Sequence, residues 1–285
     1  MKTRSEKNKK IRKEINKEAR NKKIKLFIKI TSIIFITLSL ILGYGYFIGS
    51  KVTLVNEFKI TNDTLPISFH GIKVVHISDL LYDSLNKNDL DKLITKINKL
   101  DADILIFTGN IKRKNISLEK EEINILNTFF KSLNANINKY AVKGVNDLET
   151  FSLIMENSNF KVLSNQEELL YYKDITPIKI IGFDTNNLNI DNINHDEYYT
   201  ICLLHNPDKF DNIKNINCNL ALAGNNLGGE IKIPFYKGIL TNNKYYESYY
   251  KFNNTEFYIS NGLGNNSNLR LFNKPSINLY RLTKY

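Results

Sequence analysis

The feature that most constrains the fold of this chain is a strand-and-turn pattern that recurs along its middle. The stretch Leu220–Glu230 is its fullest copy: an apolar strand runs into a turn that carries three glycines. Shorter copies end at Asp79, at Gly109-Asn110 and at Gly144–Asp147, and a further strand ends at His205. Glycine lets a backbone pass close to a neighbour. If these strands lie side by side, their ends meet at one edge of a sheet, where open α/β sheets place their ligands.

The order of elements predicts an α/β domain. Strand and helix alternate three times from residue 72 to residue 158, which argues for parallel pairing. Short strands with little helix follow, and a sandwich of two sheets with helices outside accounts for that change. We expect helices at 89–100, 118–133 and 148–158, and strands at 52–60, 72–78, 103–108, 140–143, 160–163, 169–173, 178–183 and 200–204.

The N-terminal region predicts a membrane anchor. Residues 30–48 are 19 positions without a charge, enough to cross a bilayer core as a helix. The basic residues before them place residues 1–29 in the cytoplasm and residues 52–285 outside it, at the cell membrane. This tail is also suited to bind anionic lipid. A cleaved signal peptide fits less well, because the apolar run is long and no A-x-A-like site follows; a buried soluble helix is the other alternative.

The positive charge of the chain does not indicate a nucleic-acid-binding protein. Residues 1–29 hold 13 of the 40 basic residues and 3 of the 29 acidic ones, so this tail carries +10 of the net charge of +11. A nucleic-acid groove needs basic residues spread over the fold. We therefore expect no nucleic acid among the partners.

Cys202 and Cys218 are the only cysteines, and both lie in apolar stretches. Our preferred interpretation is two buried free thiols, since they stand three and six residues before their strand ends and would not be level in neighbouring parallel strands. A disulfide is the alternative outside the cytoplasm. His76, within an apolar strand, is expected to be a packing residue.

The strand ends resemble those of the calcineurin-like metallophosphoesterases, in particular their membrane-anchored bacterial branch. That family has D-x-H, G-D, G-N-H-D, a lone H and G-H-x-H at these places. This chain has Asp79-Leu80-Leu81, Gly109-Asn110, Gly144–Asp147, His205 and Gly224–Leu227. The resemblance spans about residues 55–283. It implies a four-layer α-β-β-α sandwich over residues 52–285.

The resemblance also implies that most of the metal site is lost. In the family, seven side chains hold two divalent cations, and the histidine of G-N-H-D assists the leaving group. Asp79 and His205 match two of the seven positions, and Asn146 stands at the catalytic histidine. The other five positions hold Leu81, Asn110, Val145, Asn225 and Leu227. Leucine and valine offer no lone pair, and an amide cannot balance two cations as a carboxylate does.

We therefore expect a catalytically inactive binding or scaffold protein with no cofactor, whose protein or envelope partner the sequence does not identify. One alternative is an active metal-dependent phosphoesterase holding Mn, Fe, Zn or Mg through Asp79, Asp147 and His205. Asp83, Asn226, Tyr82 and Glu230 are further substitutes near these positions. Another alternative is an envelope-binding protein that works through its tail. The glycine turns predict a weak anion site at the N–H groups of Gly109, Gly144, Gly224 and Gly228.

Overall fold

The computed structural model describes residues 4–191, 193–194, 197–232 and 243–285. The chain divides into a helical unit that ends at Tyr44 and a second unit, Gly45–Tyr285. The first unit is α1 (Arg4–Tyr44). The helical stretch Arg12–Gly49 is long and apolar enough to cross a membrane, a property that N-terminal signal sequences share.

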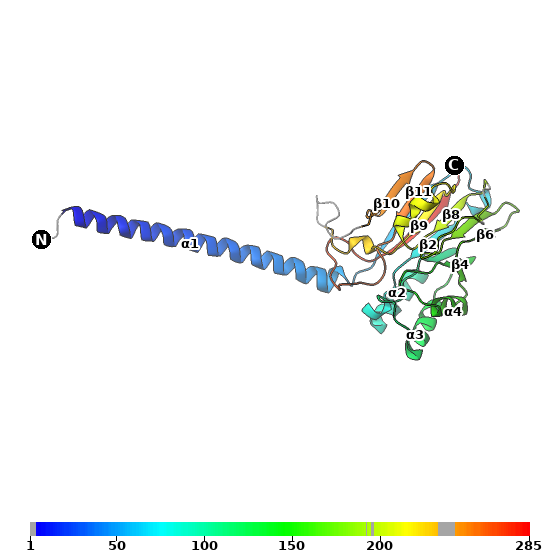
Figure 1. The fold of residues 1–285 in the computed structure, drawn as a ribbon, viewed down its shortest axis with the longest axis horizontal. Coiled ribbons are helices and arrows are strands. Elements are labelled where there is room, and N and C mark those ends of the chain that lie inside the picture. The colour runs from blue at the N-terminus through cyan, green and yellow to red at the C-terminus, as the bar shows by residue number, and fades with distance from the viewer. Residues whose placement is uncertain (1–3, 192, 195–196, 233–242) are drawn as a thin grey trace. The chain divides into compact units, whose positions relative to one another are not determined.

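The second unit contains two mixed sheets of six strands (Figure 1). The first sheet has the order β1 (Leu54–Thr61), β12 (Ser276–Thr283), β2 (Lys73–Ile77), β3 (Ile104–Phe107), β4 (Asn138–Ala141) and β5 (Lys161–Val162). The second has the order β10 (Tyr249–Phe252), β11 (Thr255–Ile259), β9 (Leu220–Ala223), β8 (Thr200–Leu203), β7 (Ile178–Gly182) and β6 (Gln166–Leu170). The predicted α/β fold with two sheets is confirmed.

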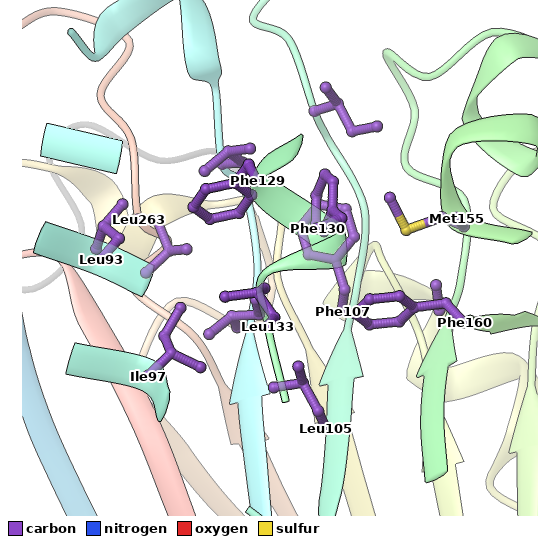
Figure 2. Close-up of a cluster of buried hydrophobic side chains, with 14 of the residues drawn as sticks. Leu93, Ile97, Leu105, Phe107, Phe129, Phe130, Leu133, Met155, Phe160 and Leu263 are labelled. Atoms are coloured by element: carbon purple, nitrogen blue, oxygen red, sulfur yellow. The ribbon is translucent and has the colours of Figure 1, made fainter. Parts of the chain in front are cut away.

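Three helices pack together on one side of the fold in Figure 1, against the first sheet: α2 (Lys87–Asn98), α3 (Lys120–Lys131) and α4 (Thr150–Asn157). Asn86 begins α2 through a capping box with Asp89. Figure 2 shows the core beneath them, where Phe130 of α3 lies 5.0 Å from Phe107 of β3 between ring centroids. Aromatic packing of this kind fixes the helices over β2, β3 and β4.

A second core fills the space between the two sheets, with Ile104 and Tyr140 from one and Ile201 and Leu222 from the other. The outer face of the second sheet packs instead against the 3-10 helix η4 (Pro207–Ile213) and loops. In the described parts of the chain no α-helix covers this face. The expected fourth, helical layer is therefore corrected to a layer of 3-10 helix and loops.

The prediction of two free thiols is wrong, because Cys202 and Cys218 form a disulfide with their Cα atoms 5.8 Å apart. Cys218 does not lie in a strand: β9 begins only at Leu220. The N–H of Cys218 donates to the Ile216 carbonyl at 2.8 Å, so the chain turns there. Cys202 faces Ala221 in the β8–β9 register, and the turn brings Cys218 back over it.

Candidate functional site

Strand ends from both sheets meet in one place, as the pattern predicted. The N–H of Gly224, after β9, donates to the carbonyl of His205, after β8, at 3.0 Å. The Nδ1 atom of His205 hydrogen-bonds the carbonyl of Thr108, after β3. A Cβ on Gly224 would lie 1.8 Å from Ser78 Oγ and 2.7 Å from Asp79 Oδ2. Only glycine fits at this crossing of the two sheets.

Asp79 is buried at the centre of this meeting point. Its Oδ1 accepts from Asn110 Nδ2 at 2.9 Å. Its Oδ2 accepts from Ser78 Oγ at 2.6 Å and from the Asn225 N–H at 2.8 Å. An ionised carboxylate has about four lone-pair positions. Protein donors thus take most of the acceptor capacity that a metal ligand at Asp79 would need.

Asn110 connects three strand ends through both ends of its amide. Its Nδ2 donates to Asp79, and its Oδ1 accepts from the Asn146 N–H at 3.0 Å. Its own N–H donates to Asp147 Oδ2 at 2.7 Å. These partners fix which end of the amide points at Asp79. A carboxylate in this position would lack the donor that the contact with Asp79 requires.

Asp147 is a buried brace between two turns. Its Oδ2 accepts from the N–H groups of Asn110 and Gly144, the latter at 2.8 Å. Its Oδ1 accepts from the Ile111 N–H at 2.8 Å. Burial raises the pKa of this carboxyl, while the three backbone donors and the nearby His205 act in the opposite direction. Asp147, considered as a substitute ligand, is thus engaged by the backbone.

His205 is the part of the site that would suit a metal. Its ring is buried, with Nδ1 on the Thr108 carbonyl. Its Nε2 is buried and has no hydrogen-bond partner among the described residues. Metal-ligating histidines commonly have one ring nitrogen on a carbonyl and the other free for the ion. His76 differs: burial lowers its pKa to about 3, and its Nε2 contacts Thr108 Oγ1 at 2.8 Å, as expected of a packing residue.

Three further positions of the resemblance, Leu81, Val145 and Leu227, offer no metal donor. Leu81 and Leu227 are buried, and Val145 is 42% exposed. Leu227 reaches Gly262, where an added Cβ would lie 2.4 Å from Leu227 Cδ2 and 3.0 Å from Asp79 Cβ. A cation beside these side chains would exchange water for hydrocarbon at a large desolvation cost. The residues present therefore do not fit a centre of two metal ions.

The described residues also lack a metal-binding cluster elsewhere. Among the described residues, no group of three or more His, Cys, Asp or Glu side chains is placed to hold a metal ion. Asp83, another substitute considered from the sequence, pairs with Arg113, whose Nε lies 2.8 Å from Asp83 Oδ2. Arg113 also accepts at its carbonyl from Asn146 Nδ2 at 3.1 Å. Asn146, at the catalytic histidine position, thus packs into the rim of the site.

Three of the four glycine N–H groups expected to bind an anion have internal acceptors. Gly144 donates to Asp147, Gly224 to the His205 carbonyl, and Gly228 to Asn226 Oδ1 at 2.9 Å. At Gly109 an added Cβ would lie 2.3 Å from the N atom of Gly144. These glycines allow close approach of neighbouring turns.

Arg270 is a buried charged residue beside the site that the sequence analysis did not single out. Its side chain is fully buried and donates to the carbonyls of Leu227 and Asn261 at 3.2 and 2.8 Å, and to Gly264. Burial lowers its pKa to about 10, and Asp79 and Glu230 oppose that shift. It remains charged at neutral pH.

Comparisons with known proteins show which family this chain is similar to. Residues 72–279 match the family described as calcineurin-like phosphoesterase. The uncharacterised metallophosphoesterase YkuE of Bacillus subtilis (strain 168) is 29% identical, over 84% of this chain and 90% of that protein. The uncharacterised metallophosphoesterase YkoQ of the same strain is 24% identical, over 82% of this chain and 92% of its own. UDP-2,3-diacylglucosamine pyrophosphatase LpxG of Chlamydia muridarum (strain MoPn / Nigg) is 25% identical, over 74% and 84%.

Proposed function

This chain belongs to the calcineurin-like phosphoesterase family, and on that premise we propose that it is a catalytically silent member. It is held at the cell membrane by its N-terminal helix, with its second unit outside the cytoplasm. There it acts as a binding or scaffold module. The family fold supplies a rigid pair of sheets with exposed turns, and a fold alone does not supply an activity. Hydrolysis by a two-metal site would also need two bound cations.

The contact between Asn110 and Asp79 carries the proposal. A neutral amide stands where the family has a carboxylate that bridges two cations, and its Nδ2 donates to Asp79 Oδ1 at 2.9 Å. The amide supplies no negative charge to a cation pair and uses an acceptor that a cation would need. Without a bound cation nothing lowers the pKa of an attacking water. Asn146, at the catalytic histidine position, cannot serve as a general acid.

Two observations support the membrane location and the side on which the second unit lies. The uncharged run of residues 30–48 follows a tail of net charge +10, the arrangement that retains an N-terminus in the cytoplasm. The disulfide between Cys202 and Cys218 is of a kind that persists in oxidising compartments and is rare in the cytoplasm. Both point to an extracytoplasmic domain.

A second candidate function is hydrolysis of a phosphate ester by a rearranged metal site. The free Nε2 of His205 is the observation in its favour. The relative named as a UDP-2,3-diacylglucosamine pyrophosphatase makes a phosphate ester or anhydride the substrate class to test. This candidate needs Asp79 to give up its protein donors, which would leave Asn110 and Ser78 without their acceptor.

Hydrolysis of bis(p-nitrophenyl) phosphate by the full-length chain, purified in detergent and supplied with Mn²⁺, tests the proposal. We expect the same background rate for the native protein, for Asp79→Ala and for the surface control Asp63→Ala. Hydrolysis that needs Mn²⁺, disappears in Asp79→Ala and persists in Asp63→Ala would overturn it in favour of the rearranged site.

A further inference from the structure

The last turn of the apolar segment is folded into the second unit. Residues Gly45–Gly49 form a short π-helix, η1, in which both glycines are buried. A Cβ on Gly45 would lie 2.4 Å from Leu271 Cδ2, and one on Gly49 would lie 2.1 Å from the Arg270 carbonyl oxygen. The two glycines therefore allow η1 to press against residues 269–271.

Hydrogen bonds hold this contact together. The Arg270 N–H donates to the Gly45 carbonyl at 3.3 Å. Asn265 Nδ2 donates to the Ser50 carbonyl at 3.2 Å, and Ser50 Oγ to the Tyr46 carbonyl at 2.7 Å. The second unit thus begins at Gly45, within the uncharged run of residues 30–48. If that run spans the membrane, residues 269–271 must lie at the level of its interface.

The surface around this contact is apolar and aromatic. Phe47 is 73% exposed, and Tyr46 and Ile48 on the same short helix are exposed. Phe272, which follows Leu271 in the chain, is 65% exposed. Phe272 has a φ of 55°, in the left-handed region that is unfavourable for a non-glycine residue. A strained backbone that presents an aromatic ring to the exterior points to a use for that ring. Aromatic residues concentrate at membrane interfaces.

A groove of about 570 Å³ opens next to the same segment. Apolar residues line part of it, among them Val52, Leu85 and Leu93. Neutral polar residues and six charged ones line the rest, four of the charged residues basic and two acidic: Lys51, Lys92, Lys96, Lys99, Asp89 and Asp91. An apolar wall with an excess of lysine matches the acyl and phosphate parts of an anionic phospholipid.

We propose that the juxtamembrane surface, defined as Tyr46–Ile48 together with Phe272, rests in the interfacial layer of the membrane. The extracytoplasmic unit is then docked directly on the bilayer through phospholipid contacts and is not a freely tethered domain. This inference rests on the membrane anchor of the proposed function. It adds a second, separate membrane contact that the anchor alone does not require.

The absence of tryptophan from the chain makes a clean test available. Three single-tryptophan proteins are compared in bilayers whose phospholipids carry bromine, which quenches tryptophan within contact range. Phe272→Trp probes the juxtamembrane surface and Phe35→Trp the apolar helix. Tyr285→Trp is the control, because Tyr285 is 88% exposed and lies beyond the far end of β12, whose eight residues span about 26 Å.

We expect Phe35→Trp and Phe272→Trp to lose most of their fluorescence and Tyr285→Trp to retain its own. Phe47→Trp gives a second probe of the same surface and should follow Phe272→Trp. If Phe35→Trp is quenched while both surface probes resemble Tyr285→Trp, the docking inference is wrong and the anchor stands. A blue shift of Phe272→Trp without quenching also contradicts it, since that indicates burial against protein. If Phe35→Trp is not quenched, both the anchor and the docking fail.

Discussion

Asn110 Nδ2 lies 2.9 Å from Asp79 Oδ1, so a neutral amide joins the end of β3 to the end of β2. Asp147 is braced by three backbone N–H groups, so hydrogen bonds to buried carboxylates join these strand ends. Each such bond contributes about 1 kcal/mol net, more where the acceptor is charged.

Replacing this amide by a carboxylate should destabilise the fold. Asn110→Asp sets two buried carboxyl groups against each other, which we expect to cost roughly 3 kcal/mol at neutral pH. The new carboxyl holds its proton to higher pH in the folded chain than in the unfolded one. The loss should therefore be small below about pH 4 and grow as the pH rises. Urea unfolding at several pH values measures it.

Asn115→Asp, on an exposed loop, is the matched control and should leave the unfolding free energy nearly unchanged. A loss for Asn110→Asp that does not vary with pH, or that equals the control's, would contradict the account of the amide.

His76 should make the protein acid-sensitive. Its pKa falls from 6.5 in the unfolded chain to about 3 in the folded one because of burial. Between these values only the unfolded chain binds the proton, so stability is lost as pH falls through this window, by about 1.4 kcal/mol per pH unit. His76→Gln should flatten the pH dependence of urea unfolding there. The exposed His70→Gln should not; equal slopes for both variants and the native chain would refute the assignment.

The disulfide should stabilise the second unit. Cys202 and Cys218 are 16 positions apart, a loop length for which a cross-link contributes about 3 kcal/mol. Dithiothreitol should lower the free energy of unfolding of the native chain, measured in urea, by that amount and leave that of the double variant Cys202→Ala, Cys218→Ala unchanged. A native chain that does not respond to dithiothreitol, although its thiols then react with iodoacetamide, would show that the bond contributes nothing.

Lysine should not be able to replace Arg270. Its guanidinium donates to three carbonyls and to Asn265 Oδ1 at 2.8 Å, and lysine cannot reproduce that planar fork. We expect Arg270→Lys to cost roughly 3–5 kcal/mol, as when a buried charge loses its partners. Arg281→Lys is the control, since Arg281 pairs with Glu57 on the surface. Similar thermal midpoints for the two variants would contradict the role assigned to Arg270.

The hydrophobic pattern of the sequence predicted most helices and strands, and the differences lie mainly at their ends. The helix expected at 89–100 is observed as α2 (Lys87–Asn98), displaced because the Asn86 capping box sets its start. The strand expected at 169–173 is observed as β6 (Gln166–Leu170), because pairing of Gln166 with Gly182 sets its register. The ends of a strand depend on packing against its neighbours in the sheet, and the sequence pattern of one strand does not show those neighbours.

Part of the candidate site could likewise be predicted from the sequence, and part could not. The sequence predicted that five strand ends meet, since glycine turns after buried strands are a local signal. It did not predict that Asp147 would be taken by backbone donors or that Cys218 would turn back over Cys202. The burial of Arg270 among carbonyls was equally invisible, because those carbonyls come from residues 227–264, on other turns. Such contacts depend on the paths of loops.

Inductively coupled plasma mass spectrometry of the native, full-length protein, purified without chelators, shows whether the chain holds a pair of divalent cations. We expect far less than one divalent cation per chain, and the same value for Asp79→Ala. About two cations per chain, as in two-metal hydrolytic sites, lost together in Asp79→Ala and retained in Asp63→Ala, would contradict it.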